Sequence, residues 1–198
     1  MKTKVTSFLL LSFLSFSTVC NGQSLQTSDG VRHWEADFSA GLNNDGYQID
    51  AGIAYFPIQY IGIKSQIGFA GELKAVEDWG RDEYQTGHKY ALRIKFMPSV
   101  VLRSPRIFEW KEQESSFYLF TEPGMVFSPG ARGSKGAKAV SWGVKSGITL
   151  QMDNVMIYFG YGISDFSLYS GRPYNQHGIP QKDNYITHSV FIGTAFKF

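Results

Sequence analysis

The chain has 198 residues, with 19 lysines and arginines against 17 aspartates and glutamates. This balance excludes the strongly basic surface of a nucleic-acid-binding protein, and the length is enough for one domain. The composition is unusual in its aromatic residues, 16% of the chain, and in its 21 glycines.

Residues 1–22 have the three parts of a secretory signal peptide. Lys2 and Lys4 precede an apolar stretch of leucines and phenylalanines, and small and polar residues follow up to Gly22. The apolar stretch is too short, and too often interrupted by serine, for a membrane-spanning helix. We expect cleavage near Gly22, which leaves residues 23–198 as a single domain without a cysteine. A retained membrane anchor is the alternative.

No later segment is apolar for long enough to be a transmembrane helix. Apolar and polar residues instead alternate, as they do along a strand with two different faces. The alternation recurs in eight runs, at 34–42, 47–55, 61–69, 90–96, 117–127, 140–150, 155–163 and 186–198. Runs of about ten residues have the length of strands that cross a bilayer on a tilt. The pattern predicts an all-β fold, a closed antiparallel up-and-down transmembrane β-barrel of about eight strands.

The polar faces of these runs carry charged residues, which we expect to point into the barrel. The predicted network in the lumen consists of Glu35, Asp37, Asp50, Lys64, Arg93, Lys95, Glu122 and Lys145. A soluble sandwich or lipocalin-like barrel, the alternative fold, would turn its apolar faces inward instead. Because the interior of an eight-stranded barrel is filled by side chains, we expect a plugged lumen of paired charges. A charged path for ions or protons is the alternative.

The lengths of the connections test this reading, since outer-membrane barrels have longer external loops and short periplasmic turns. The external connections are predicted at 43–46, 70–88, 128–138 and 167–184, and the periplasmic ones at 57–59, 104–116 and 152–154. The segment 104–116 is the main exception. Pro98 and Pro123 interrupt the fourth and fifth runs, although a closed barrel has no edge strand to hold a proline. We expect them to share a bulge or to mark where this hairpin leaves the membrane.

Aromatic residues gather near the ends of the runs, as in the interfacial girdles of membrane barrels. One girdle is predicted from Trp34, Tyr55, Tyr60 and Phe198, and the other from Tyr47, Phe69, Tyr90 and Trp142.

The export signal, the eight runs and the last residues Phe191-Ile192-Gly193-Thr194-Ala195-Phe196-Lys197-Phe198 resemble the small outer-membrane β-barrel family. Its members include the transmembrane domain of outer-membrane protein A and other porin-like small barrels. The resemblance covers the mature chain and rests on pattern rather than on a specific motif. It implies a bacterial outer-membrane location in a Gram-negative cell. It also implies that Phe196 and Phe198 form the signal read by the barrel-assembly machinery, with periplasmic chaperones as further partners during biogenesis.

The external loops are the predicted place of function, since loops on a rigid scaffold commonly carry binding sites. The candidate ligand-binding residues are Trp79, Arg132, Lys135, Lys138, Arg172, Tyr174 and His177. In the basic loop, Arg132, Lys135 and Lys138 offer point charges to lipopolysaccharide phosphates. Opposite charges on neighbouring loops that only close the barrel mouth are the alternative.

An enzyme that changes the acyl chains of lipid A would need a nucleophile and a base within reach of each other. The candidates are His188 with Ser189, then Ser167, His177 and His88. His188 and Ser189 are adjacent in a strand and point to opposite faces, so they cannot pair directly. We therefore expect a structural or surface-interaction protein rather than an enzyme, with the lipid A enzyme and a narrow ion channel as alternatives. We expect a monomer among membrane lipids and lipopolysaccharide, with no cofactor and no metal.

Overall fold

The computed structural model describes residues 33–73, 91–110, 115–131, 134–172 and 185–198. Among these residues no helix is long and apolar enough to cross a membrane. The predicted signal peptide lies outside the described residues, and its cleavage stays a prediction.

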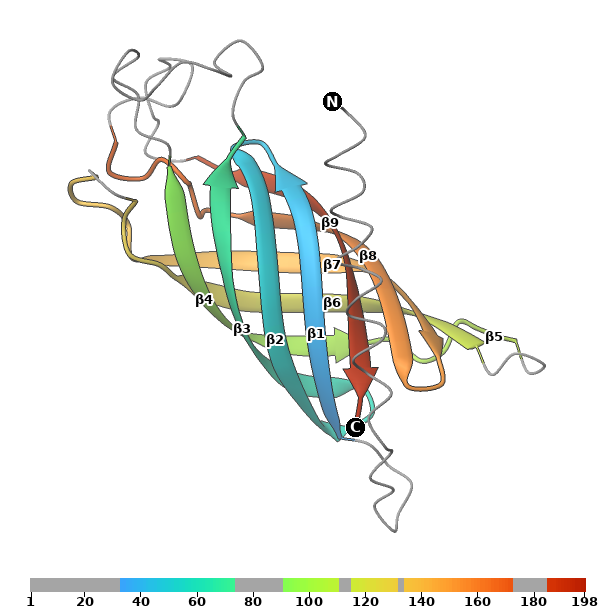
Figure 1. The fold of residues 1–198 in the computed structure, drawn as a ribbon. Coiled ribbons are helices and arrows are strands. Elements are labelled where there is room, and N and C mark those ends of the chain that lie inside the picture. The colour runs from blue at the N-terminus through green and yellow to red at the C-terminus, as the bar shows by residue number, and fades with distance from the viewer. Residues whose placement is uncertain (1–32, 74–90, 111–114, 132–133, 173–184) are drawn as a thin grey trace. The chain divides into compact units, whose positions relative to one another are not determined.

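The described residues form nine strands in one antiparallel sheet (Figure 1). They are β1 (Trp34–Asn43), β2 (Gly46–Ile58), β3 (Ile61–Glu72), β4 (Leu92–Arg103), β5 (Phe108–Trp110), β6 (Ser115–Phe127), β7 (Val140–Met152), β8 (Val155–Ser164) and β9 (Thr187–Lys197). Each long strand pairs with the next along the chain, while β1 pairs with β9 and β4 with β6, which closes the barrel. Because β5 is a short addition to one end of β6, the barrel has the eight strands and the up-and-down order that were predicted.

The outer face of the barrel is apolar and its inner face is polar. In β3, Ile63 and Ile67 are 61% and 64% exposed, whereas Gln66 between them is 1% exposed. In β4, Ile94 is 61% exposed and its neighbour Arg93 is 2% exposed. A soluble barrel would bury the isoleucines and expose the arginine, so this arrangement excludes the soluble alternative and suits a surface in contact with lipid.

Two junctions close the barrel, and they differ in regularity. The β1–β9 ladder runs without interruption from Glu35 paired with Lys197 to Asn43 paired with Ser189. The β4–β6 ladder has only four pairs, which are Phe96 with Phe127, Ser99 with Gly124, Leu102 with Thr121 and Arg103 with Phe120. We call this the β4–β6 junction.

Pro98 and Pro123 do not form the bulge that was predicted for them. One register accounts for all four pairs of the β4–β6 junction, and it offsets the two prolines by two residues. Each proline pairs on its other side with a regular strand, Pro98 with Ser65 and Pro123 with Val144. The alternation also continues past Pro98, since Val101 is buried and Val100 is exposed. The prolines reduce the number of hydrogen bonds between β4 and β6, because they donate no backbone hydrogen bond, but they do not change the register of the strands.

The two ends of the barrel differ in their connections. One end, which we call the terminal end, holds the start of β1 and the end of β9 together with the two-residue turns 59–60 and 153–154. The other, the loop end, holds the turn 44–45 and the connections β3–β4, β6–β7 and β8–β9. The β3 strand continues to Glu72, past the predicted start of its loop, and β5 lies within the connection predicted as 104–116.

Aromatic side chains lie at both ends, as the girdle prediction requires. Trp34 and Tyr55 are 4.9 Å apart between ring centroids at the terminal end. Tyr47 and Phe69 form an edge-to-face pair at 6.3 Å near the loop end. Trp142 is 47% exposed on the outer face, while Tyr90 lies outside the described residues.

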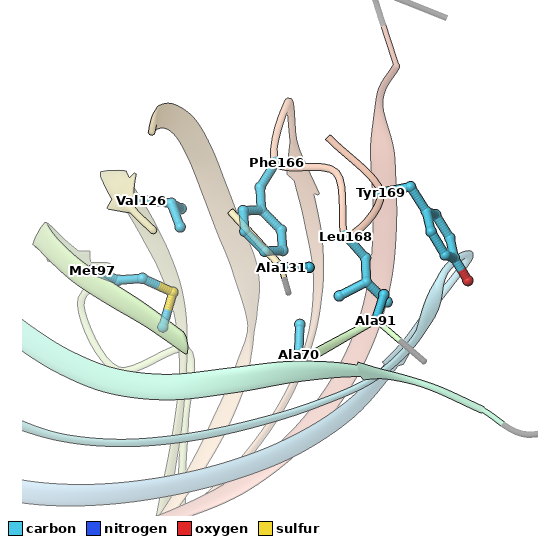
Figure 2. Close-up of a cluster of buried hydrophobic side chains, with 8 residues drawn as sticks. All are labelled: Ala70, Ala91, Met97, Val126, Ala131, Phe166, Leu168 and Tyr169. Atoms are coloured by element: carbon cyan, nitrogen blue, oxygen red, sulfur yellow. The ribbon is translucent and has the colours of Figure 1, made fainter. Parts of the chain in front are cut away.

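Apolar side chains fill both ends of the interior. The loop-end cluster, drawn in Figure 2, consists of Ala70, Ala91, Met97, Val126, Ala131, Phe166, Leu168 and Tyr169. The cluster nearer the terminal end consists of Tyr118, Met156, Tyr158, Phe191 and Ala195, with Phe120 packed against it. Glycines make room for these large side chains: a Cβ at Gly193 would lie 2.3 Å from the Tyr158 ring. Charged residues share the interior with these clusters, since Lys64 Nζ lies 5.7 Å from the centre of the Tyr158 ring.

Candidate functional site

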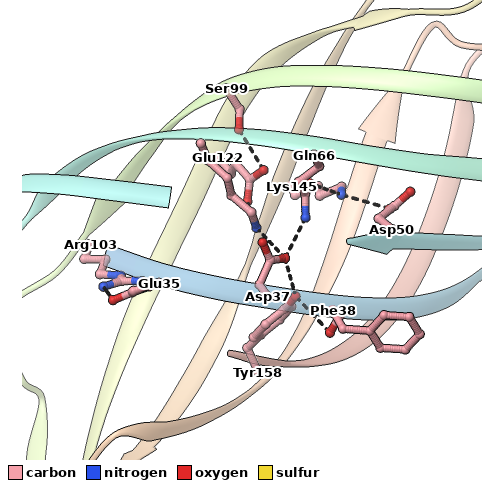
Figure 3. A network of polar contacts seen from close by, with 11 residues as sticks. Glu35, Asp37, Phe38, Asp50, Gln66, Ser99, Arg103, Glu122, Lys145 and Tyr158 are labelled. Carbon is pink, nitrogen blue, oxygen red and sulfur yellow. Dashed lines mark hydrogen bonds and ion pairs between the residues drawn. The ribbon is translucent and has the colours of Figure 1, made fainter. Parts of the chain in front are cut away.

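An ion-paired network crosses the middle of the lumen (Figure 3). Lys64 of β3 places its Nζ 3.0 Å from Asp37 Oδ2 of β1 and 3.1 Å from Glu122 Oε2 of β6. Asp37 Oδ2 also accepts hydrogen bonds from Gln66 Nε2 at 2.7 Å and from the Tyr158 hydroxyl at 3.0 Å. These contacts tie together strands from opposite sides of the barrel, because alternation aims every one of these side chains inward.

A second group of charges lies on the loop-end side of this network. Asp50 receives two lysines, with Lys95 Nζ 3.0 Å from Oδ1 and Lys145 Nζ 3.2 Å from Oδ2. Lys145 also donates to Gln66 Oε1 at 3.0 Å, and Lys95 to Gln48 Oε1 at 3.3 Å. Gln66 therefore joins the two groups, since its amide nitrogen binds Asp37 and its amide oxygen binds Lys145.

At the terminal end, Glu35 forms a bidentate ion pair with Arg103. Arg103 Nη1 donates to Glu35 Oε1 at 2.7 Å, and Nη2 contacts Oε2. The guanidinium carbon lies 3.8 Å from the centre of the Phe56 ring and 5.2 Å from that of Tyr118. Lys197 Nζ is 3.9 Å from Glu35 Oε1.

Arg103 was not among the predicted residues of the lumen. The sequence does contain a sign of its position, because Arg103 follows Arg93 and Lys95 at even spacing along one strand and so shares their face. Pro98 between them concealed this signal, since a proline suggested a break in the strand.

Arg93 does not pair with a carboxylate of the predicted network, which corrects the expectation for this residue. Its guanidinium donates to the backbone carbonyls of Ser128, Pro129, Lys138 and Ser167 at 2.6–3.0 Å, and to Ser128 Oγ at 3.1 Å. The loops fold inward over the end of the lumen, and their carbonyls occupy the position where a carboxylate was expected. A fixed fork of donors suits several carbonyls at once.

Residues 166–169 of the β8–β9 connection, which we call the mouth segment, lie inside the loop end of the barrel (Figure 2). Phe166 is 5% exposed, and Leu168 and Tyr169 are 1% exposed. The Arg93 guanidinium carbon is 4.7 Å from the centre of the Phe166 ring. An apolar segment held by a buried arginine thus covers the inner charges from this end.

Asp45, in the turn between β1 and β2, anchors the mouth segment. Its carboxylate accepts a hydrogen bond from the Leu168 backbone N–H at 3.1 Å and another from the Tyr185 hydroxyl at 2.8 Å. Burial raises the pKa of Asp45, and the two hydrogen bonds offset part of that rise. Burial and the neighbouring Asp45 together raise the pKa of Tyr185. The anchor was not predicted, because Asp45 is an ordinary turn residue and nothing in the local sequence indicates a distant partner.

Two small cavities lie within the lumen. One of about 40 Å³ is lined by Glu35, Asp37, Lys64 and Arg103 among others, and one of about 50 Å³ by Lys95 and Lys145 among others. Glu122 lines both, so the Lys64–Glu122 ion pair lies between them. Cavities of this size have room for a few water molecules.

The described residues of the predicted loop site come from two connections that are bonded to each other. The Lys135 N–H donates to the Gly171 carbonyl at 2.9 Å, and the Lys138 N–H donates to Ser170 Oγ at 2.9 Å. Gly171 has a φ of +78° and a Cβ there would lie 2.8 Å from Ala137 N, so the close approach requires glycine. These bonds bring Lys135 beside the segment that carries Arg172.

The side chain of Lys138 forms an ion pair with Asp165, so one of the predicted charges is neutralised within the loops. Trp79, Arg132, Tyr174 and His177 lie outside the described residues.

The candidate catalytic residues are not assembled in the described part of the chain. His188 is exposed on the outer face, where its Nδ1 lies 2.6 Å from the Tyr161 hydroxyl. Ser189 is 8% exposed on the opposite face, and Ser167 is also 8% exposed, inside the loop end. His88 and His177 lie outside the described residues. Within the described residues, no three His, Cys, Asp or Glu side chains are grouped so as to hold a metal ion.

The two predicted assembly residues differ in their structural surroundings. Phe196 lies in β9 and pairs with Ala36 of β1 and Val155 of β8. Phe198 follows the last strand and is 58% exposed.

The sequence matches no protein-family model and no curated protein. Solved structures do match. Neisserial surface protein A, NspA, is 14% identical with a TM-score of 0.50, over 84% of this chain and 96% of that one. The N-terminal β-barrel domain of Pseudomonas aeruginosa OprF is 9% identical with a TM-score of 0.48, over 84% and 98%. The outer membrane enzyme PagL is 8% identical with a TM-score of 0.45, over 83% and 99%.

Identities this low bear on the fold alone. The comparison of folds rests on NspA, whose structure this chain covers almost completely. The shared architecture agrees with the apolar outer face and the polar interior described above. The chain is therefore a membrane-spanning β-barrel with the fold of the small eight-stranded outer-membrane barrels.

Proposed function

We propose that this protein is a non-catalytic outer-membrane barrel with a closed, charge-paired lumen, which acts at the cell surface through its external loops. The observation that carries the proposal is the series of ion pairs along the lumen, from Arg103 with Glu35, through Lys64 with Asp37 and Glu122, to Asp50 with its two lysines. These side chains occupy the path that an ion would take.

Energetics support a permanently closed interior. Breaking a buried ion pair leaves an uncompensated charge and costs about 3–5 kcal/mol. An ion passing through would have to displace several such pairs and also the mouth segment above them. The two cavities are separated by the Lys64–Glu122 pair and have room for only a few water molecules each.

The loops are the part of the chain left for an interaction role. Lys135 is exposed and lies beside the segment that carries Arg172, because the Lys135 N–H bonds the Gly171 carbonyl and the Lys138 N–H bonds Ser170 Oγ. We propose that this surface, with Arg132, binds phosphate groups of lipopolysaccharide, since charge-assisted hydrogen bonds to phosphate are among the stronger polar contacts. The ion pair of Lys138 with Asp165 orients the basic connection rather than binding the ligand.

Ion conductance of the refolded protein in a planar bilayer tests the closed lumen. The wild-type protein is expected to be silent. The double substitution Lys64→Ala with Glu122→Ala, which removes the pair between the two cavities, is the variant most able to open a path. Thr121→Ala is the matched control, because Thr121 bonds Ser146 on the outer face. Reproducible channels from the wild type would contradict the proposal and favour the narrow channel.

Binding of lipopolysaccharide in detergent micelles, measured by calorimetry, tests the loop surface. We expect Lys135→Gln and Arg172→Gln each to weaken binding by about tenfold to a hundredfold, since a hydrogen bond to a charged group contributes roughly 1.5–3 kcal/mol. Arg106→Gln, at the opposite end of the barrel, is the control and leaves affinity unchanged. Equal affinity of all variants, or equal binding of dephosphorylated lipopolysaccharide, would contradict phosphate recognition.

The mass of lipid A from cells expressing the protein tests the absence of catalysis. We expect an unchanged number of acyl chains, because His188 bonds Tyr161 on the outer face and Ser189 points to the other face. A loss or gain of one acyl chain would overturn this part of the proposal.

A further inference from the structure

The β5 strand and the residue before it expose large apolar side chains at the terminal end. Ile107 is 62% exposed, Phe108 53% and Trp110 52%, and the rings of Phe108 and Trp110 meet edge to face at 5.4 Å. In a protein in water, three such neighbours would be costly to leave uncovered. They belong to the connection that was the exception to the expected loop lengths, since this end otherwise has two-residue turns.

Phe108 and Trp110 continue the lipid-facing surface of the barrel. Phe108 pairs directly with Phe117 of β6, which pairs with Leu150 of β7, which pairs with Ile157 of β8. Directly paired residues of an antiparallel sheet lie on the same face. The next row on that face consists of Leu119, Ile148 and Phe159, which are 48%, 50% and 56% exposed. Phe108 and Trp110 therefore extend an apolar surface that already faces lipid.

The backbone of β5 restricts the depth at which this surface can lie. Among the described residues β5 pairs only with β6, and Figure 1 shows it at the far end of β6. Its other edge presents backbone polar groups, which cost several kcal/mol each when left unsatisfied in hydrocarbon. These groups need headgroups or water, so β5 fits the interface between hydrocarbon and water, where tryptophan is also enriched.

The opposite face of the segment is charged and suits water. Arg106 Nη1 lies 2.9 Å from Glu109 Oε1, and both side chains are about half exposed, at 48% and 49%. An apolar face beside a charged face is the pattern of a segment that lies on a membrane surface.

From these four observations we infer that Phe108 and Trp110, next to the exposed Ile107, form an interfacial lipid-binding surface, which rests in the headgroup region of the leaflet at the terminal end. The ligand of this surface is phospholipid, because the surface is continuous with the lipid-facing side of the barrel and the second edge of β5 requires polar partners. The long connection between β4 and β6 thereby acquires a role, as an anchor that sets how deep this side of the barrel sits.

Fluorescence quenching in phospholipid vesicles tests the inference. A variant with Trp34→Phe, Trp79→Phe and Trp142→Phe keeps Trp110 as its single tryptophan. We expect its emission to be quenched by phospholipids brominated near the headgroup end of the acyl chain, and less by those brominated near the methyl end. Iodide in the aqueous phase should have a weaker effect on it than on a tryptophan in solution.

Two matched variants calibrate the measurement. The protein that keeps only Trp142, 47% exposed on the outer face of β7, reports a lipid-facing position. Glu109→Trp, in a background with all four native tryptophans replaced by phenylalanine, reports the charged face and should respond mainly to iodide. Folding of each variant is checked by its heat-dependent gel mobility.

Quenching of Trp110 by iodide without quenching by brominated lipid would overturn the inference, because it would place the segment in water. Protection from both quenchers would overturn it too, since it would mean that a second copy of the chain covers β5. Quenching that is strongest for bromine near the methyl end would show burial in hydrocarbon, which the free edge of β5 argues against.

Discussion

Glu35 and Arg103 show how a single pair of residues stabilises the interior. Arg103 lies against the rings of Phe56 and Tyr118, and Glu35 is the carboxylate that compensates its charge. Lys197, at 3.9 Å, is a second cation for Glu35. If Arg103 is lost, Glu35 still has Lys197 as a partner, whereas if Glu35 is lost, Arg103 has no other partner in this group. Loss of the carboxylate is therefore more damaging than loss of the guanidinium.

Replacing Glu35 by methionine is expected to destabilise the barrel by about 3 kcal/mol, the cost of a stranded buried charge. The double variant Glu35→Met with Arg103→Met should recover most of that loss, since it buries no lone charge. Urea unfolding of the protein in lipid vesicles measures both free energies. A double variant as unstable as the single one would mean that packing, and not charge, dominates.

Gly193 tests close packing inside the lumen. A Cβ at this position would lie 2.3 Å from Tyr158 Cζ, and Tyr158 cannot move away freely because its hydroxyl bonds Asp37. Gly193→Ala should lower the free energy of unfolding by roughly 1–3 kcal/mol, as overpacking does. Thr194→Ala, one residue along on the outer face, is the control in the same unfolding experiment. Equal stability of the two variants would show that the aromatic cluster can repack.

At the scale of elements, the β4–β6 junction is the weak part of the sheet. It has four residue pairs where β1–β9 has a continuous ladder, and Pro98 and Pro123 donate no backbone hydrogen bond. We expect amides of β4 and β6 to exchange with deuterium faster than those of β1 and β9, since exchange follows local opening. Mass spectrometry of the reconstituted protein measures this. Uniform protection around the barrel would contradict the expectation.

The mouth segment is a second element with its own stability. Since folding raises the pKa of Asp45, the protonated carboxyl is favoured in the folded state, and its stabilising contribution is lost as the pH rises through the folded pKa. The segment should therefore be held more firmly at a pH below the ordinary aspartate pKa of 3.8 than at neutral pH. Limited proteolysis of the β8–β9 connection at the two pH values measures this difference.

Two variants separate the charge of Asp45 from its hydrogen bonds. Asp45→Asn keeps an acceptor oxygen for the Leu168 N–H without a charge, so protection should stay high and no longer depend on pH. Asp45→Ala removes the acceptor and should increase cleavage at both pH values. Retention of the pH dependence in Asp45→Asn would assign it to another group.

At the scale of the whole molecule, the last strand completes the barrel and the final residue lies beyond it. Phe196 pairs with strands on both sides, whereas Phe198 follows β9 and is 58% exposed. If both residues form the assembly signal, Phe198→Ala should reduce the amount of barrel in the outer membrane of living cells while leaving refolding in vitro unchanged. Phe196→Ala should impair both. Quantified outer-membrane fractions and refolding yields distinguish the two, and normal assembly of Phe198→Ala in cells would contradict the signal.

The sequence by itself determined the fold class, the number of long strands and the face to which most residues point. These follow from local rules, because a period of two residues decides inside from outside whatever the neighbouring strand is. The opposite faces of Ile63 and Lys64, and those of Ile94 and Arg93, follow from alternation without knowledge of the neighbouring strands.

Only the tertiary structure decided which charges pair. Glu35 forms an ion pair with Arg103, which belongs to a strand that is distant in the sequence. Arg93 binds loop carbonyls in place of a carboxylate. The register of each strand and the path of the mouth segment set these contacts, and neither leaves a mark on local periodicity. Alternation assigns a side chain to the lumen, but the height and the direction at which it meets a partner depend on how the closed barrel brings distant strands together.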